Sequence, residues 1–310
     1  MAIPFILELV VCLSEIATDF RMPVSPLSEM LETIGRDNSS RLFLVESTPT
    51  GFMWNPNDLA ISMVILFPFF FFMKHKLLKV LGCGTIFFIL LMTSSRGAFI
   101  ALIFAVMAYP FLYKVRHVPI FIFGLLLTVF VLIQNLDYFE NHSNIQIQEI
   151  SQSFDMLENY LFNKSGENET SIGIRQKLIQ NGLFALNETM YVGVGGGGSV
   201  MVQELVGGIG QHHVLSMHNF WLEVMVEAGI LFGMAFIIWY IILLVRTYFL
   251  SLKTDDPTIN YTSKALTLGM FGFLLGAVSS SSTIYFFPMW MMFGLSLAVL
   301  NVGEPLLEKK

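Results

Sequence analysis

Long apolar runs decide what this chain can fold into. Runs long enough to cross a bilayer lie at 2–17, 57–73, 78–94, 97–113, 118–134, 221–245, 265–281 and 284–301. A helix of 18 residues is about 27 Å long, which is close to the thickness of the hydrocarbon core. With 55% hydrophobic and 13% charged residues, the chain carries more apolar surface than a water-soluble core absorbs. The sequence therefore predicts an all-α, polytopic integral membrane protein with about eight membrane-spanning helices.

Lysine and arginine in the connections between these runs predict the orientation. Basic residues gather at 74–79, at 113–117, at 246–253 and in the terminal EKK, all on one side of the predicted bundle. By the positive-inside rule that side is the cytoplasm, so we expect a multi-pass protein of the cell membrane with both termini cytoplasmic. The first run contains Glu8 and Glu15 and is the least regular of the predicted spans.

Three regions follow from this topology. They are N-terminal helices at 1–134 with a first outer loop at 18–56, an extracytoplasmic loop domain at 135–220, and C-terminal helices with a cytoplasmic tail at 221–310. The loop domain holds nine acidic and three basic side chains, and the whole chain has a net charge of −6. This balance excludes nucleic acid as a partner and makes the few cations of the loop domain candidates for binding a specific anion.

Neither a metal nor a cofactor is predicted. Cys12 and Cys83 both lie in apolar runs, and the spacing of His212 and His213 before His218 matches no known set of metal ligands. The glycine run 193–198 fits the pattern GxGxxG but has no βαβ context. We interpret it as a flexible loop, with a phosphate-binding nest of backbone N–H groups as the alternative.

Two arginines are candidates for binding an anion. Arg96, in SSRGAF, lies at the predicted outer end of two spans, where it either extends to the interface along lipid or clamps an anion with its planar guanidinium. Arg175 opens an amphipathic pattern and is either a solvated surface residue or a second anion ligand. The apolar positions of that pattern are Ile174, Leu178, Ile179, Leu183 and Phe184.

His218 is the candidate base. The string MHNFWLEVMVEAGILFG places His218 and Asn219 directly before a predicted span. Glu223 and Glu227 follow with a four-residue spacing, which puts both carboxylates on one helix face, where we expect them to line a polar cavity. An imidazole beside carboxylates is suited to accept a proton near neutral pH. The alternative is a histidine that is hydrogen-bonded at the membrane interface.

The string WNPNDLA at 54–60 opens the second run. Asn55, Asn57 and Asp58 surround Pro56 at the start of the predicted helix, where such residues cap helices. The same amides and carboxylate are suited to hydrogen-bond sugar hydroxyls, which is the alternative interpretation.

Taken in order, these motifs resemble a known family. The succession NPNDLA, SRGA, IR, GVGGGG and HNFWLEVMVEAGILFG, from about Pro49 to about Leu300, is similar to the O-antigen ligase and polysaccharide polymerase superfamily of bacterial membrane glycosyltransferases. Within it the chain looks closest to Gram-positive polymerases of teichuronic acid or exopolysaccharide. Members usually have more helices upstream, so we expect that this chain starts partway into a larger bundle.

The resemblance implies a reaction and a set of roles. An oligosaccharide carried on undecaprenyl pyrophosphate would pass to an acceptor glycan hydroxyl at the outer face of the membrane, without a metal or nucleotide sugar. Arg96 and Arg175 would hold the pyrophosphate and His218 would activate the hydroxyl. The remaining substrate-binding candidates are Asn55, Asn57, Asp58, Asn219 and Glu227.

Several alternatives stay open at this stage. A ligase would differ from a polymerase only in its acceptor, and a transporter or flippase of lipid-linked glycans would show charged or broken spans near the membrane midplane. A non-catalytic scaffold is a third possibility. The expected partners are the lipid bilayer, the lipid-linked donor, the acceptor glycan and other polysaccharide export proteins.

Overall fold

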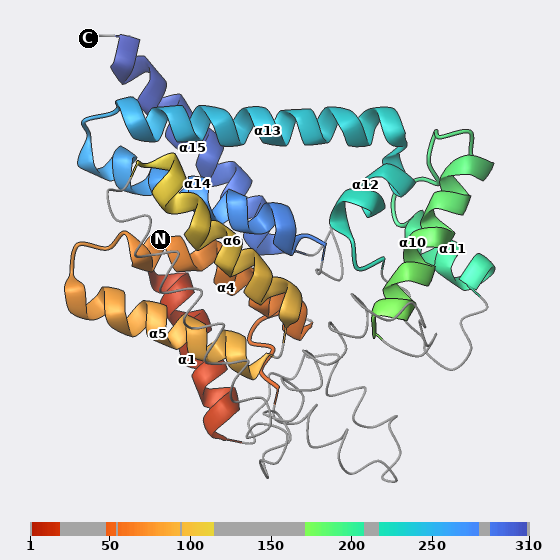
Figure 1. Cartoon of the computed structure of the whole chain (residues 1–310), viewed down its shortest axis with the longest axis horizontal. Helices are drawn as coiled ribbons and strands as arrows, with labels where there is room; N and C mark the ends of the chain where they lie inside the picture. Colours follow the sequence, from red (N-terminus) through yellow and green to blue (C-terminus); the bar gives the residue numbers. More distant parts are fainter. Residues whose placement is uncertain are drawn as a thin grey trace. The chain divides into compact units, whose positions relative to one another are not determined.

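The computed structural model describes residues 2–18, 48–53, 55–93, 95–114, 171–207, 217–278 and 286–308, and over these ranges it contains helices and no strands. The chain divides into two compact units, Met1–Ser165 and Gly166–Lys310, which we describe one at a time (Figure 1). The all-helical prediction is thus confirmed for the described part. The predicted span at 118–134 and both histidines at 212–213 lie outside it, and the three-region division stays a prediction.

The first unit contains four described helices, α1 (Ala2–Ala17), α4 (Pro56–Phe71), α5 (Lys76–Met92) and α6 (Arg96–Leu112). Their bounds lie within two residues of the predicted apolar runs, because the apolar stretch itself sets the helix length. Short connections make α4, α5 and α6 alternate in direction. Helix α4 provides the core of the unit, since its side chains from Leu59 to Leu66 are buried.

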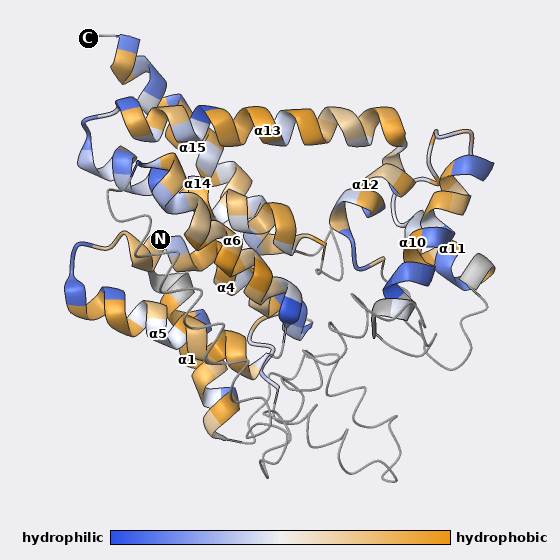
Figure 2. Ribbon diagram, viewed as in Figure 1, coloured by the Kyte–Doolittle hydropathy of each residue, from blue (hydrophilic) through white to orange (hydrophobic). Residues whose placement is uncertain are grey.

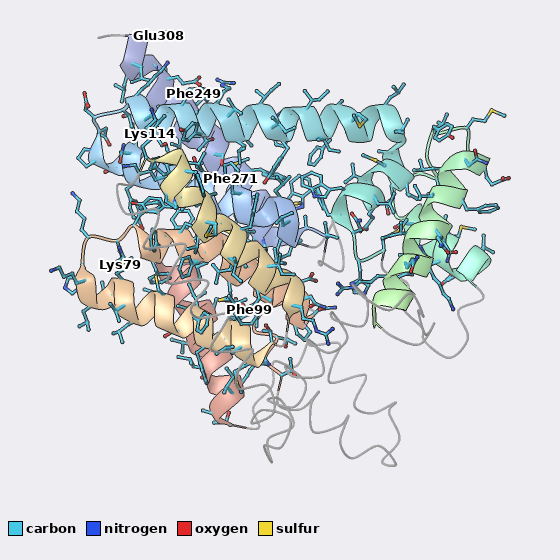
Figure 3. All side chains as sticks on the ribbon, viewed as in Figure 1. Lys79, Phe99, Lys114, Phe249, Phe271 and Glu308 are labelled. Atoms are coloured by element: carbon cyan, nitrogen blue, oxygen red, sulfur yellow. The ribbon has the colours of Figure 1, made fainter. Side chains whose placement is uncertain are left out.

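Two polar motifs and the described lysines lie at opposite ends of this unit. At one end, Ser95 before α6 donates a hydrogen bond to Asn57 in the first turn of α4. At the other end, the Lys79 ammonium lies 4.7 Å from the centre of the Phe71 ring (Figure 3). Phe72 contacts Tyr113 there, next to Lys114. The polar motifs and Arg96 are therefore at the end of the unit opposite to Lys79 and Lys114, while the orientation in a membrane stays a prediction.

The two acids of α1 have backbone partners. Glu15 Oε2 accepts hydrogen bonds from the Thr50 and Gly51 N–H groups at 2.9 and 2.7 Å, and Glu8 Oε1 accepts from the Phe52 N–H at 3.2 Å. Both carboxylates are buried. A β-carbon on Gly51 would collide with Glu8 Oε1, so the segment lies directly against α1. The acids of the irregular first run therefore fasten the segment that leads into α4.

The second unit contains α10 (Ser171–Glu188), α11 (Gly198–Gly207), α12 (Phe220–Ala228), α13 (Ile230–Lys253), α14 (Pro257–Gly276) and α15 (Phe287–Glu308). Helices α13 and α14 form a hairpin in which Asp256 caps α14 by accepting from the Thr258 and Ile259 N–H groups. Arg246 of α13 pairs with Glu304 of α15, so both helices end at the same side of the unit.

The predicted single span at 221–245 is wrong, because the helix breaks at Gly229 into α12 and α13. Gly229 has φ +87° and ψ 160°, a conformation that is essentially restricted to glycine. The loop that follows α10 occupies the break: the Val194 N–H donates to the Val226 carbonyl at 2.8 Å, and the Ile230 N–H donates to the Tyr191 carbonyl at 3.0 Å. Hydropathy does not reveal this break, since the apolar run continues through it.

An aromatic cluster holds α12 against α14. Trp221 donates from Nε1 to the Leu274 carbonyl at 3.1 Å, and the Phe220 N–H donates to the Ala277 carbonyl at 2.9 Å. The buried Tyr240 hydroxyl donates to the Met270 carbonyl. The rings of Phe220, Trp221, Phe236, Tyr240, Phe273 and Phe293 contact one another at centroid distances of 5.0 to 6.4 Å. The start of α12 is thereby fixed at the C-terminal end of α14.

Two of the described helices, α13 and α15, are long and apolar enough to cross a membrane. Figure 2 shows apolar residues over most of the length of α13. Helices α4 and α6 are apolar but shorter. The arrangement of about eight spans stays a prediction.

Replacing Glu15 with alanine should loosen the segment at 48–53. The change leaves the Thr50 and Gly51 N–H groups without their acceptor, and a hydrogen bond to a charged group contributes about 1.5–3 kcal/mol. Chymotrypsin should then cleave after Phe52 faster than in the unchanged protein. Ser14→Ala is the matched control, because the Ser14 hydroxyl donates to the Val10 carbonyl of its own helix. Equal cleavage rates for the two variants would contradict the role of Glu15.

Replacing Gly229 with alanine should destabilise the second unit. The new β-carbon would collide with the Val192 carbonyl oxygen, and the backbone conformation costs a non-glycine residue about 1–3 kcal/mol. We expect a lower melting temperature for the detergent-solubilised protein. Gly196→Ala serves as the control, since nothing lies within 4 Å of its added carbon. If both variants melt alike, the break does not depend on Gly229.

Candidate functional site

The first unit places Asn55, Asn57, Asp58 and Arg96 at one end. Asn55 caps α4 by accepting a hydrogen bond from the Asn57 N–H at 2.7 Å. Asn57 Oδ1 accepts from the Ser95 hydroxyl at 2.9 Å, and Ser95 immediately precedes Arg96. The two motifs around NPND and SRGA are therefore joined by a direct hydrogen bond. The structure shows capping by Asn55, while sugar binding by these residues stays a prediction.

Arg96 occupies the first turn of α6 and is exposed. A helix N-terminus carries partial positive charge from its unsatisfied N–H groups. Ser95 stands at the N-cap but makes no capping hydrogen bond, because its hydroxyl bonds to Asn57 instead. The positive charge of the Arg96 guanidinium and the partial positive charge of the helix N-terminus therefore lie at the same end of α6. Such an arrangement attracts an anion more strongly than a guanidinium alone.

Arg175 lies on the face of α10 that packs against α11 and α12. One turn further, Leu178 is fully buried, and its carbonyl accepts a hydrogen bond from Gln203 of α11 at 3.1 Å. Two turns further, a β-carbon on Gly182 would collide with Met217. The predicted apolar face of this helix is only partly right. Leu178 and Ile179 pack inward, but Leu183 and Phe184 are about half exposed.

The guanidinium of Arg175 is half-buried, and burial lowers its pKa. Within the described ranges, no hydrogen bond or ion pair engages it. Arginine nevertheless remains charged at any relevant pH. A partly desolvated cation gains from a bound anion, because the anion replaces the lost hydration.

His218 is held between two fixed neighbours. Met217 is buried in a cluster with Leu186, Leu222 and Val226. Asn219 caps α12 by accepting from the Leu222 N–H at 3.2 Å. His218 itself has φ +47°, a left-handed conformation that few non-glycine residues adopt and that histidine and asparagine tolerate better than most. The fixed neighbours on both sides therefore determine the backbone position from which the half-buried imidazole extends.

The two glutamates of α12 have different surroundings. Glu223 is buried in the first turn of the helix, whereas Glu227 is half-buried and accepts a hydrogen bond from the Ser199 hydroxyl at 2.6 Å. Ser199 lies in the first turn of α11, so the Glu227 carboxylate faces a helix N-terminus, where negative charge is stabilised. Glu227 therefore couples α12 to α11.

The glycine loop is joined to the helix break. The Gly195 N–H donates to the Glu227 carbonyl at 2.9 Å, and a β-carbon on Gly193 would lie 2.5 Å from the Gly229 nitrogen. The Glu227 carboxylate lies at the N-terminus of the helix that follows this loop. This arrangement favours a structural role, in which the loop packs against the break between α12 and α13, over a phosphate-binding nest of backbone N–H groups.

Arg175, His218, Asn219 and Glu227 all belong to the second unit, where they lie on α10, on α12 and in the residues 217–219 directly before α12. Sequence reasoning missed Ser95, Ser199 and Gln203, whose side chains tie these elements together. The pairs Asn57–Ser95 and Ser199–Glu227 are each separated by more than 25 residues, so no local pattern announces them. Gln203 has one signal, since an amide within an apolar helix needs a partner.

In the described residues no group of three histidine, cysteine or acidic side chains is arranged to hold a metal ion.

Comparison with known protein families supports the resemblance to the O-antigen ligase and polymerase superfamily. The family model described as O-antigen ligase matches residues 81–238, which is just over half of the chain and contains Arg96, Arg175, His218 and Glu227. A search of curated proteins returned no match. The chain belongs to the O-antigen ligase family, whose members are membrane-associated, glycosyltransferase-like ligases and polymerases.

Proposed function

We propose that this protein transfers lipid-linked oligosaccharide units onto an acceptor sugar hydroxyl, as a polysaccharide polymerase. The donor is an oligosaccharide on undecaprenyl pyrophosphate, and the reaction takes place at the outer face of a membrane that the chain crosses about eight times, with both termini cytoplasmic. The observation that carries this proposal is the half-buried Arg175, which has no carboxylate partner among the described residues and lies inside the family match.

The reaction needs one base and a stabilised leaving group. His218 takes the proton of the acceptor hydroxyl as the oxygen attacks the anomeric carbon of the donor sugar. The bond between that carbon and the pyrophosphate oxygen breaks, and the electron pair leaves with the pyrophosphate. Arg96 and Arg175 neutralise the negative charge that develops there. Because these two guanidinium groups neutralise the negative charge of the departing pyrophosphate, it can leave without receiving a proton. No metal ion is then needed for this role, and we propose a metal-independent reaction.

The other candidates act around this reaction. Asn219 orients His218 through the start of α12, and Glu227 orients the same helix through Ser199. Asn55, Asn57 and Asp58 bind sugar hydroxyls near Arg96, in addition to the capping that Asn55 performs. Other polysaccharide export proteins are proposed as partners.

Variants at the three catalytic candidates should lose polymer elongation. His218→Asn keeps a residue that tolerates the left-handed backbone but removes the base, and we expect a loss of about 10²–10⁴-fold. Arg96→Ala and Arg175→Ala should each cost about 10²–10³-fold. The measurement incubates purified protein with an undecaprenyl pyrophosphate oligosaccharide and follows chain length on gels, with and without a chelator.

Matched controls separate these roles from general damage. Arg246→Ala removes an exposed arginine paired with Glu304, and His75→Ala removes the capping side chain of α5. Both should elongate normally. Undiminished chain lengths in all three catalytic variants would end the proposal, and loss of activity with chelator would overturn the metal-free reaction. Polymer joined to a different acceptor without lengthened carrier-linked chains would make the protein a ligase.

The pair Ser199–Glu227 should behave as one functional unit. If Glu227 acts through Ser199, Ser199→Ala and Glu227→Gln each lower the turnover number, and the double variant is no slower than the slower single one. The substrate concentration for half-maximal rate should change little. Fully additive losses would instead mean that Glu227 acts directly on the substrate.

A further inference from the structure

A short strained turn follows α10 and presents apolar side chains outward. Met190 and Tyr191 have φ +49° and +65°, two consecutive left-handed residues that are not glycine. The side chains of Met190, Tyr191 and Val192 are 84%, 51% and 76% exposed. Left-handed non-glycine residues persist only where their surroundings hold them in place. A turn held in this way with its apolar side chains outward suggests that something apolar covers it.

The turn is held by hydrogen bonds at both ends. Its first half closes the end of α10, because the Tyr191 N–H donates to the Leu186 carbonyl at 2.8 Å and the Val192 N–H donates to the Thr189 carbonyl at 3.1 Å. Its second half is fixed to the break between α12 and α13, where the Tyr191 carbonyl accepts from the Ile230 N–H. The turn is therefore a built part of the unit.

This attachment makes the turn continuous with the apolar surface of α13. Directly after Ile230, the side chains of Leu231 and Phe232 are 85% and 59% exposed. We name the set Met190, Tyr191, Val192, Leu231 and Phe232 the apolar turn patch. Further along α13, outward apolar side chains continue with Met234, Ile238, Ile241, Ile242 and Val245. Since α13 is long and apolar enough to cross a membrane, the patch extends a surface of the kind that faces acyl chains.

We propose that the turn Met190–Val192 inserts into the bilayer, in the leaflet at the N-terminal end of α13. Met190 and Val192 lie among acyl chains, and Tyr191, with an apolar ring and a polar hydroxyl, lies at the boundary with the headgroups. The turn and α13 together hold α10, α11 and α12 at the membrane surface. His218 and Arg175 are thereby kept at a constant depth, which suits a substrate whose carrier is a lipid. The insertion itself does not depend on the proposed reaction.

The alternative occupants of the patch are water and protein, and site-directed spin labelling distinguishes all three. Cys12→Ala and Cys83→Ala remove the native thiols, and Met190→Cys and Val192→Cys are then labelled with a nitroxide in the full chain. The protein is reconstituted into phosphatidylcholine and phosphatidylglycerol vesicles. Collision rates are measured with oxygen, which concentrates in acyl chains, and with a water-soluble nickel complex.

Two further labels calibrate the measurement inside the same unit. Ile242→Cys, on the outward face of α13, reports acyl chains, and Glu204→Cys, exposed on α11, reports water. We expect the labels at 190 and 192 to be shifted from the water reference towards the acyl reference. Collision rates equal to those at 204 would overturn the proposal. Low rates with both reagents would also overturn it, because they would mean that protein covers the turn. Elongation assays on the same samples show independently whether the proposed reaction holds.

Discussion

Polar groups inside an apolar helix bundle need partners from the same bundle, because lipid provides none. This requirement accounts for several buried contacts among the described residues. Glu8 and Glu15 accept backbone N–H groups, the buried Tyr240 hydroxyl donates to a carbonyl, and Gln203 reaches the backbone of α10. Each of these bonds joins two elements, so satisfying a polar group also fixes the arrangement of helices within its unit.

The sequence predicts the helices of the first unit better than those of the second, where α14 begins at Pro257, well before the predicted run 265–281. Apolar runs at 57–73, 78–94 and 97–113 give α4, α5 and α6 nearly to the residue, since hydropathy and helix length are local properties. The run 221–245 misleads, because the break at Gly229 depends on a loop that lies some 35 residues earlier in the chain. The buried face of α10 is also misjudged at Leu183 and Phe184, since the packing of α11 and α12 selects that face.

In the candidate site, too, the sequence indicates the residues but not the contacts that position them. Residue types and motif order indicated Arg96, Arg175, His218 and Glu227, and the family match contains all four. The contacts that hold them were not predictable, since Ser95 and Ser199 are ordinary serines in the sequence. Met217 is similar: it looks like one more apolar residue, but its burial against Gly182 anchors the residue before the imidazole.

The hydrogen bond between Ser95 and Asn57 has a consequence for how this chain can vary. Each residue belongs to a motif that starts a different helix, and replacing either one with an apolar residue leaves the other without this partner in a partly buried setting. The two helix starts therefore depend on each other through this one contact. Replacing either residue with an apolar one removes the side-chain hydrogen bond between the start of α4 and the start of α6.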